Sequence, residues 1–123
     1  MKELTKAEEE VMQVLWRLDK AFVKEVLAEF PNPKPAYNTI STIIRILEKK
    51  QFVGFKAFGK THQYFPLVSI EEYKSKISSN LLSNYFGGSI ENMVSFFAKK
   101  KAIDVNELDS ILKELKSKTK KDE

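Results

Sequence analysis

Cysteine is missing from this sequence of 123 residues, which excludes disulfide bonds and thiolate metal ligands. Histidine occurs once, as His62, and a zinc site needs about three or four clustered ligands, so we expect no metal site. No apolar run approaches the roughly 20 residues of a membrane-spanning helix, and the charged stretch Met1–Lys6 lacks an apolar signal core. These absences predict a cytoplasmic protein that does not bind a membrane directly.

Motifs for catalysis are missing as well. The sequence has no glycine-rich phosphate loop, no nucleophile elbow and no His-Glu-x-x-His pattern. His62 falls in an expected turn, where a lone histidine is more often a surface residue than a base or a ligand. The acidic run Glu8–Glu10 lies at an expected helix start, where negative charge favours the helix dipole. We therefore expect no catalytic residue, no enzyme activity and no cofactor.

Basic residues are concentrated in one segment. The whole chain has a net charge of +4, yet residues 34–60 alone hold six basic residues and one acidic residue, a net +5. A local basic surface is the electrostatic pattern of a nucleic-acid binder, although charge alone is equally compatible with a solvated lysine-rich face. The basic residues are Lys34, Arg45, Lys49, Lys50, Lys56 and Lys60, and the acidic one is Glu48.

A capping box of Thr5 and Glu8 begins the first predicted helix, and an apolar stripe at helical spacing follows it. A second apolar stripe between Phe22 and Phe30 predicts another short amphipathic helix. Three prolines within residues 31–35 end this helix, because proline cannot lie in a helix interior.

The third predicted helix covers residues 36–50 and has two distinct faces. One is apolar and predicted to be buried; the other is rich in short hydroxyl and amide side chains, holds two cations and has no acid. Such a face can approach base-pair edges in the DNA major groove, with the long cations reaching phosphate or guanine. The apolar face contains Ile40, Ile43, Ile44 and Leu47, and the polar face contains Asn38, Ser41, Thr42, Arg45 and Lys49.

Two strands, residues 53–58 and 63–68, are predicted to form a hairpin whose turn is Gly59–His62. Three helices followed by a hairpin, the wing, give the order of the winged helix-turn-helix. The predicted fold class is mostly α with a small β-hairpin: a winged-helix domain over residues 1–69 and a helical domain with a charged tail over residues 70–123. The wing residues expected along the DNA backbone or minor groove are Lys56, Lys60, Thr61 and His62.

The helical segment 70–123 predicts self-association. Its three expected helices make a poor core alone, and a symmetric partner is the commonest way to bury such apolar faces. The alternative is that they fold back on the N-terminal domain. The residues expected in the homodimer interface are Ile77, Leu81, Leu82, Tyr85, Ile90, Met93, Val94, Phe97, Leu108, Ile111, Leu112 and Leu115.

Five stretches, taken in order, carry a resemblance over nearly the whole chain: Leu4–Glu8 with the apolar stripe after it, Ala36–Arg45, Leu47–Val53, Tyr64–Val68 and Phe86–Ser89. Together they resemble the penicillinase-repressor family of winged-helix transcriptional repressors. The resemblance implies a C-terminal dimerisation domain and binding to palindromic operators on double-stranded DNA that silence β-lactamase or related resistance genes. It also implies a membrane-bound sensor that triggers cleavage of the repressor, which weakens the dimer and releases DNA. Tyr37 joins the expected DNA-binding set, which also includes Thr39 as a further short polar side chain near the start of the third predicted helix.

Three departures from the family pattern bear on function. Gln51 stands where the family usually has glycine, which favours a left-handed helix end, so this end is expected to be built differently. The family's Asn-Phe cleavage bond aligns with Phe96 and Phe97; either the sequence preference of cleavage differs here or induction is not proteolytic. The Cys-x-Cys pairs of the copper-responsive branch are absent, which excludes copper sensing through thiolates.

Two hypotheses follow. The leading one is a homodimeric, sequence-specific DNA-binding transcriptional repressor, favoured by the acid-poor helix face and the basic segment. The alternative is a winged-helix protein-interaction module without specific DNA binding. Under the leading hypothesis the Ile90–Phe97 helix is a natural control point for the dimer, and the alternative role for this helix is simple packing.

Overall fold

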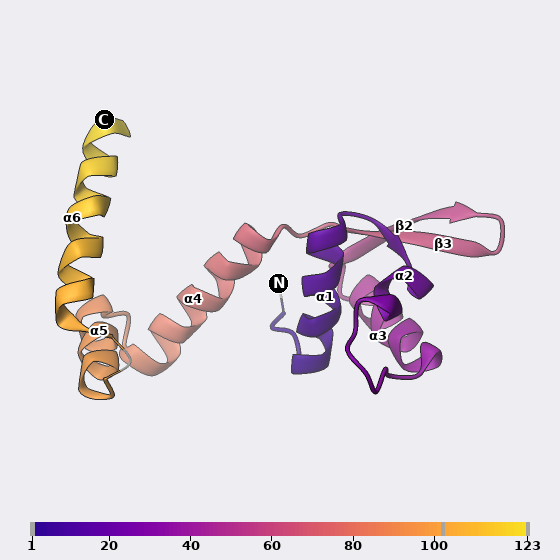
Figure 1. Ribbon diagram of the computed structural model, residues 1–123, viewed down its shortest axis with the longest axis horizontal. Coiled ribbons are helices and arrows are strands. Elements are labelled where there is room, and N and C mark those ends of the chain that lie inside the picture. Colours follow the sequence, from indigo (N-terminus) through magenta and orange to yellow (C-terminus); the bar gives the residue numbers. More distant parts are fainter. Residues whose placement is uncertain (1, 102, 123) are drawn as a thin grey trace. The chain divides into compact units, whose positions relative to one another are not determined.

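The computed structural model describes residues 2–101 and 103–122 and is shown in Figure 1. Residues up to Ile77 form one compact unit and residues from Ser78 form a second. The first unit contains α1 (Lys6–Leu18), β1 (Ala21–Phe22), α2 (Val23–Ala28), α3 (Tyr37–Lys49), β2 (Val53–Phe58) and β3 (Thr61–Pro66). Helix α4 (Ile70–Phe86) begins in the first unit and ends in the second, which also holds α5 (Ile90–Lys99) and α6 (Val105–Asp122).

Helices α1 and α4 begin where the predicted capping boxes place them. The Glu8 N–H donates to Thr5 Oγ1 at 3.2 Å, and the Thr5 N–H donates to Glu8 Oε1 at 3.0 Å, which confirms the capping box of α1. Ser69 and Glu72 make the same reciprocal pair before α4, at 3.0 and 3.3 Å. Each box satisfies N–H groups that a helix start otherwise leaves without partners.

The sheet is larger than the predicted hairpin. Its three antiparallel strands have the order β1-β3-β2, with Ala21 opposite Tyr64. Phe22 therefore ends a strand instead of beginning the second helix, and its N–H donates to Glu25 Oε1 at 2.9 Å at the start of α2. The expectation of a two-stranded sheet is corrected, whereas the mostly helical class with a small antiparallel sheet is confirmed.

The hairpin turn is tighter than the sequence predicts. Strand β3 begins at Thr61, which pairs with Phe58, so the turn consists of Gly59 and Lys60 alone. Gly59 has φ 63°, a left-handed conformation that glycine adopts without steric cost. Placing His62 in the turn was therefore wrong, because His62 lies in β3 opposite Ala57. Figure 1 shows the hairpin extending past the helices of this unit.

The core lies where α1, α2 and α3 meet the base of the sheet. Trp16 and Tyr73 attach the start of α4 to this unit: Trp16 Nε1 donates to the Val68 carbonyl at 2.8 Å, and Tyr73 Oη donates to Glu9 Oε1 at 3.0 Å. The first compact unit thereby includes about two turns of α4, beyond the Ser69 boundary that the sequence predicts. The core residues are Val11, Met12, Val14, Leu15, Ala21, Val23, Val26, Ile40, Ile44, Leu47, Phe52, Val53, Tyr64 and Tyr73.

The end of α3 corrects the expectation about Gln51. The Phe52 N–H donates to the Leu47 carbonyl at 2.9 Å and the Gln51 N–H donates to the Glu48 carbonyl at 3.0 Å. These are the two hydrogen bonds of a Schellman motif, and the buried Phe52 and Leu47 side chains supply its usual apolar pair. Gln51 itself adopts the left-handed conformation, with φ 66°. The helix ends in the same way as with glycine, at a backbone strain that glycine would avoid.

The second unit is built from helices with little shielding. Gly87 and Gly88 separate α4 from α5, and both have positive φ, at 56° and 79°. Asp104 Oδ1 accepts from the Asn106 N–H at 2.7 Å and so caps α6. None of the side chains described between residues 78 and 118 is buried. Within the described residues, no helix has the length and apolar character that crossing a membrane requires.

Candidate nucleic-acid interface

Helix α3 has a buried and an exposed face. Ile40, Ile44 and Leu47 are at most 1% exposed, and Ile43 packs against the core at its edge, so the predicted apolar face is confirmed. On the exposed side, four residues recur at spacings of three and four and form one line along the helix. This polar row contains no acid and consists of Asn38, Thr42, Arg45 and Lys49, all exposed.

A groove of about 580 Å³ lies between α2, α3 and the hairpin, and we call it the wing groove. The structure brings six of the residues singled out from the sequence to its walls: Tyr37, Ser41, Arg45, Lys60, Thr61 and His62. Five predicted residues lie outside the groove: Asn38, Thr42 and Lys49 of the polar row, Thr39, which is also exposed on α3, and Lys56. Arg45 thus belongs both to the polar row and to the wing groove, so it joins the two surfaces.

Six further residues line the wing groove that the sequence did not single out: Phe22, Val23, Lys24, Glu25, Glu48 and Tyr64. Lys24 adds a cation from α2 to Arg45 of α3 and Lys60 of the hairpin. Two carboxylates offset part of this charge, and one of them, Glu25, accepts the Phe22 N–H. Burial raises the pKa of Tyr64, and the Glu48 carboxylate raises it further against the influence of Arg45. Tyr64 is therefore neutral at physiological pH.

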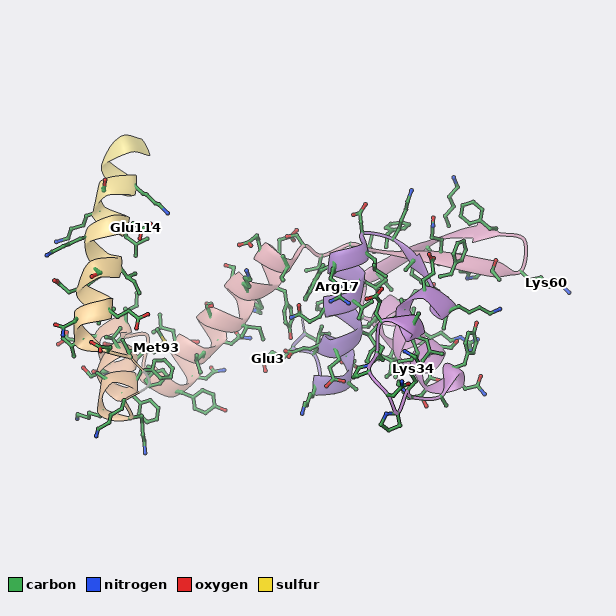
Figure 2. All side chains as sticks on the ribbon, viewed as in Figure 1. Glu3, Arg17, Lys34, Lys60, Met93 and Glu114 are labelled. Carbon is green, nitrogen blue, oxygen red and sulfur yellow. The ribbon has the colours of Figure 1, made fainter. Side chains whose placement is uncertain are left out.

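The two faces of the hairpin carry different side chains. Lys60 lies at the tip and points away from the body of the unit (Figure 2). Lys56 lies on the face opposite His62, with its Nζ 5.3 Å from the centroid of the Phe58 ring. Thr61 Oγ1 donates to the Phe58 carbonyl at 2.9 Å and so braces the turn. Of the predicted wing residues, Lys60, Thr61 and His62 thus belong to one site, and Lys56 does not.

Two of the six basic residues in the segment 34–60 are engaged in the fold. Lys34 Nζ donates to the carbonyl of Ala28 at 3.0 Å, near the end of α2. Lys50 Nζ lies 2.7 Å from Glu8 Oε1, and these side chains are 22% and 7% exposed. Burial raises the pKa of Glu8, but hydrogen bonds from Lys50 and Thr5 and the Lys50 charge lower it more, so the net pKa is below the ordinary value. The neighbouring Lys49 remains exposed on the polar row.

The residues expected in a dimer interface fall into three groups. Ile77 packs against the core of the first unit. Five residues are half-buried within the second unit: Leu82, Met93, Val94, Phe97 and Leu108. Six are exposed there, and Tyr85, at 79%, is the most exposed of them; the others are Leu81, Ile90, Ile111, Leu112 and Leu115. Phe96 and Val105 are exposed large apolar side chains that the sequence analysis did not assign to this surface.

Known proteins resemble this chain over most of its length. The sequence model of the penicillinase repressor family matches residues 4–117. The chain belongs to the penicillinase repressor family. Over 110 residues it is 30% identical to the methicillin resistance regulatory protein MecI of Staphylococcus aureus strain N315, with 89% of each chain covered. Over 122 residues it is 28% identical to the penicillinase repressor of Bacillus licheniformis, with 96% of this chain and 95% of that protein covered.

A solved structure supports the fold of the first unit. The chain resembles the solution structure of the DNA-binding domain of the repressor BlaI, with a TM-score of 0.51 and 28% identity. The match covers 59% of this chain and 94% of that domain. The penicillinase repressor family and the winged-helix architecture expected from the residues are therefore confirmed.

The candidate cleavage position lies inside a helix in this member of the penicillinase repressor family. Phe96 and Phe97 are consecutive residues of α5, and both rings contact Phe86 of α4, at centroid distances of 5.7 and 6.3 Å. Lys100 Nζ lies 5.9 Å from the centroid of the Phe96 ring. The bond between Phe96 and Phe97 has helical geometry, so a protease that binds extended chains must first unwind this part of α5.

Proposed function

We propose that this chain is a sequence-specific DNA-binding transcriptional repressor whose α3 enters the major groove. The observation that carries the proposal is the polar row, which is exposed, free of acids and backed by a buried apolar face on the same helix. The relatives named as a penicillinase repressor and a resistance regulatory protein, and the likeness to a repressor's DNA-binding domain, support the same function.

The proposed contacts follow from the reach of each side chain. Asn38 and Thr42 are short, so they let the helix backbone approach the base edges, where each base pair has its own pattern of donors and acceptors. Arg45 and Lys49 lie further along α3 and reach guanine or phosphate. Lys60, at the tip of the hairpin, contacts the neighbouring DNA backbone, and such a contact positions the domain without reading sequence.

We further propose that the chain acts as a homodimer through residues 70–123, with residues 1–69 as the DNA-binding domain. The support is the lack of any buried side chain among the described residues 78–118, combined with exposed apolar residues such as Tyr85 and Ile90. A second copy supplies the missing apolar layer. Two linked DNA-binding domains, the heads of the dimer, bind a pseudo-palindromic operator far more tightly than one domain does.

The biological setting of the proposal comes from the relatives. Their names associate them with penicillinase and methicillin resistance, so we place β-lactamase or related resistance genes under this chain's control. The chain then works in the cytoplasm, where it meets the chromosome, and acts by binding DNA without chemistry or cofactor of its own. A membrane sensor protease that cuts between Phe96 and Phe97 would act by unwinding α5 and weakening the dimer.

The test compares side chains expected to contact base edges with a side chain expected to contact phosphate. Thr42→Ala and Arg45→Ala should each weaken binding to the operator by about 1–3 kcal/mol while leaving the thermal unfolding midpoint unchanged, since both side chains are exposed. Lys60→Ala should weaken binding to all duplexes alike and lower the salt slope by about one. Unchanged operator affinity in both α3 variants would remove the assignment of the recognition helix.

A protein-interaction module is the second candidate, and one surface favours it. Phe58, Phe65 and Leu67 are exposed on the face of the hairpin region opposite His62. Three apolar side chains on one face suit a protein partner more than they suit DNA. Under this alternative, the chain binds duplex DNA weakly, and substitutions in the polar row do not change that binding. Phe65→Ser then disrupts binding of the protein partner, whereas Thr42→Ala leaves it intact.

A further inference from the structure

His62 occupies a fixed position on the wing. Its imidazole ring stacks on Phe55, with ring centroids 4.3 Å apart and planes at 11°, and meets Tyr64 edge-on at 6.1 Å. Strand pairing sets Phe55 opposite Tyr64 and Ala57 opposite His62, so the three rings share one face of the hairpin. One face of the imidazole is therefore covered by Phe55, and its edge borders the wing groove.

The groups around His62 have opposing effects on its charge. Cations come from three elements, and they disfavour a further positive charge in the groove. Two carboxylates favour it, and two tyrosine hydroxyls also face the groove. The groups that face the wing groove beside His62 are Lys24 and Glu25 from α2, Tyr37, Arg45 and Glu48 from α3, and Lys60 and Tyr64 from the hairpin. An anion that enters the wing groove therefore adds a negative charge beside the imidazole.

We propose that His62 is a proton-linked ligand for the DNA backbone and that Phe55 is its positioning residue; the inference rests on the proposed function. A phosphate in the wing groove accepts a charge-assisted hydrogen bond from a protonated imidazole, which is stronger than a bond from the neutral ring. The Phe55 ring face stabilises the same protonated form through a cation–π contact. DNA binding therefore takes up a proton at His62.

The composition of the chain allows the effect of one imidazole on DNA binding to be measured separately. His62 is the single histidine, and histidine is the one side chain whose ordinary titration falls between about pH 5 and 8. Proton uptake should strengthen DNA binding roughly threefold to tenfold between pH 8 and pH 6. The added positive charge should also steepen the dependence of log affinity on log salt by about 0.9 at the lower pH.

The experiment measures binding of the full chain to a fluorescent random-sequence duplex of about 30 base pairs, by anisotropy, across salt concentrations at pH 6 and pH 8. His62→Gln keeps an N–H donor but cannot become charged, so its affinity and salt slope should not change with pH. Phe55→Leu should reduce the pH effect, and Phe55→Tyr should restore it. Phe58→Leu is the matched control, because Phe58 is an exposed aromatic on the opposite face and should leave the pH effect intact.

The outcomes separate this inference from the proposed function. Salt-dependent binding that is the same at both pH values, or a pH effect that survives in His62→Gln, overturns the role of His62 alone. An equal pH effect in Phe55→Leu and wild type overturns the role of Phe55. An absence of salt-dependent binding to duplex DNA at either pH overturns the proposed function and this inference with it.

Discussion

Lys49 and Lys50 are adjacent lysines with different surroundings, and a matched pair of substitutions should separate their roles. Lys49 is exposed on the polar row, whereas Lys50 Nζ lies 2.7 Å from Glu8 Oε1 at a site where Glu8 is only 7% exposed. Substitution by methionine removes the charge and keeps most of the aliphatic stem. Lys50→Met should therefore destabilise the fold, and Lys49→Met should weaken DNA binding instead.

The size of the stability effect follows from what Glu8 loses. Without Lys50 the carboxylate keeps the Thr5 N–H at 3.0 Å but has no opposite charge in a buried position. Breaking a fully buried pair costs about 3–5 kcal/mol; because the Lys50 side chain is 22% exposed, we expect about 2–3 kcal/mol here. In a unit of this size that lowers the unfolding midpoint by roughly 10–20 °C. Lys49→Met should stay within about 0.5 kcal/mol of wild type.

The effect of Lys50 should also depend on pH. The pKa of Glu8 in the fold is below its ordinary value, so the pair stabilises the protein above the pKa of glutamate in the unfolded chain. That stability is lost as the pH falls through the lower pKa of the folded state. The difference between Lys50→Met and wild type should therefore be full at pH 7 and shrink below about pH 4.

Thermal unfolding followed by circular dichroism at pH 7 and at a pH below about 4, together with DNA titrations, checks this prediction. Lys49→Met should lower the salt slope of DNA binding by about one, and Lys50→Met, measured well below its unfolding midpoint, should leave the slope unchanged. Equal midpoints for the two variants, or a loss of salt slope in Lys50→Met, would refute the assignment of Lys50 to the fold and Lys49 to the DNA surface.

Three other outcomes are expected. Gln51→Gly should stabilise the first unit by about 0.5–1 kcal/mol in denaturant unfolding, because it relieves the left-handed strain at φ 66°; no gain would contradict the strain. A chain ending after Ile77 should fold and sediment as a monomer, and a dimer of this chain would contradict the proposed interface. A chain ending after Ser69 lacks the buried Tyr73 and should lose about 3 kcal/mol of unfolding free energy. Inserting about 5 base pairs between operator half-sites should abolish tight binding, and retained affinity would mean that the heads bind independently.

The elements that the sequence predicted well are those with local signals. Thr5 with Glu8, and Ser69 with Glu72, are partners three residues apart, so both helix starts are visible in a short window. β1 is two residues long, and its pairing of Ala21 with Tyr64 joins distant parts of the chain, so no periodic pattern marks it.

The candidate site shows the same division. The polar row follows from helical spacing alone, and its exposure was predicted correctly. The wing groove depends on tertiary packing: Lys24 comes from α2, and its neighbours in the sequence give no sign that it lines the same groove as Arg45 and Lys60. Lys50 is the clearest case, because its partner Glu8 is brought to it only by the packing of α1 against α3.

Selection of binding sites from a random duplex library can show whether this chain reads DNA sequence as a dimer through α3. We expect an enriched pseudo-palindrome with half-site centres separated by a multiple of about 10 base pairs, and loss of that enrichment in Thr42→Ala and Arg45→Ala. Recovery of no preferred sequence, or of the same sequence with both variants, would contradict sequence reading through α3.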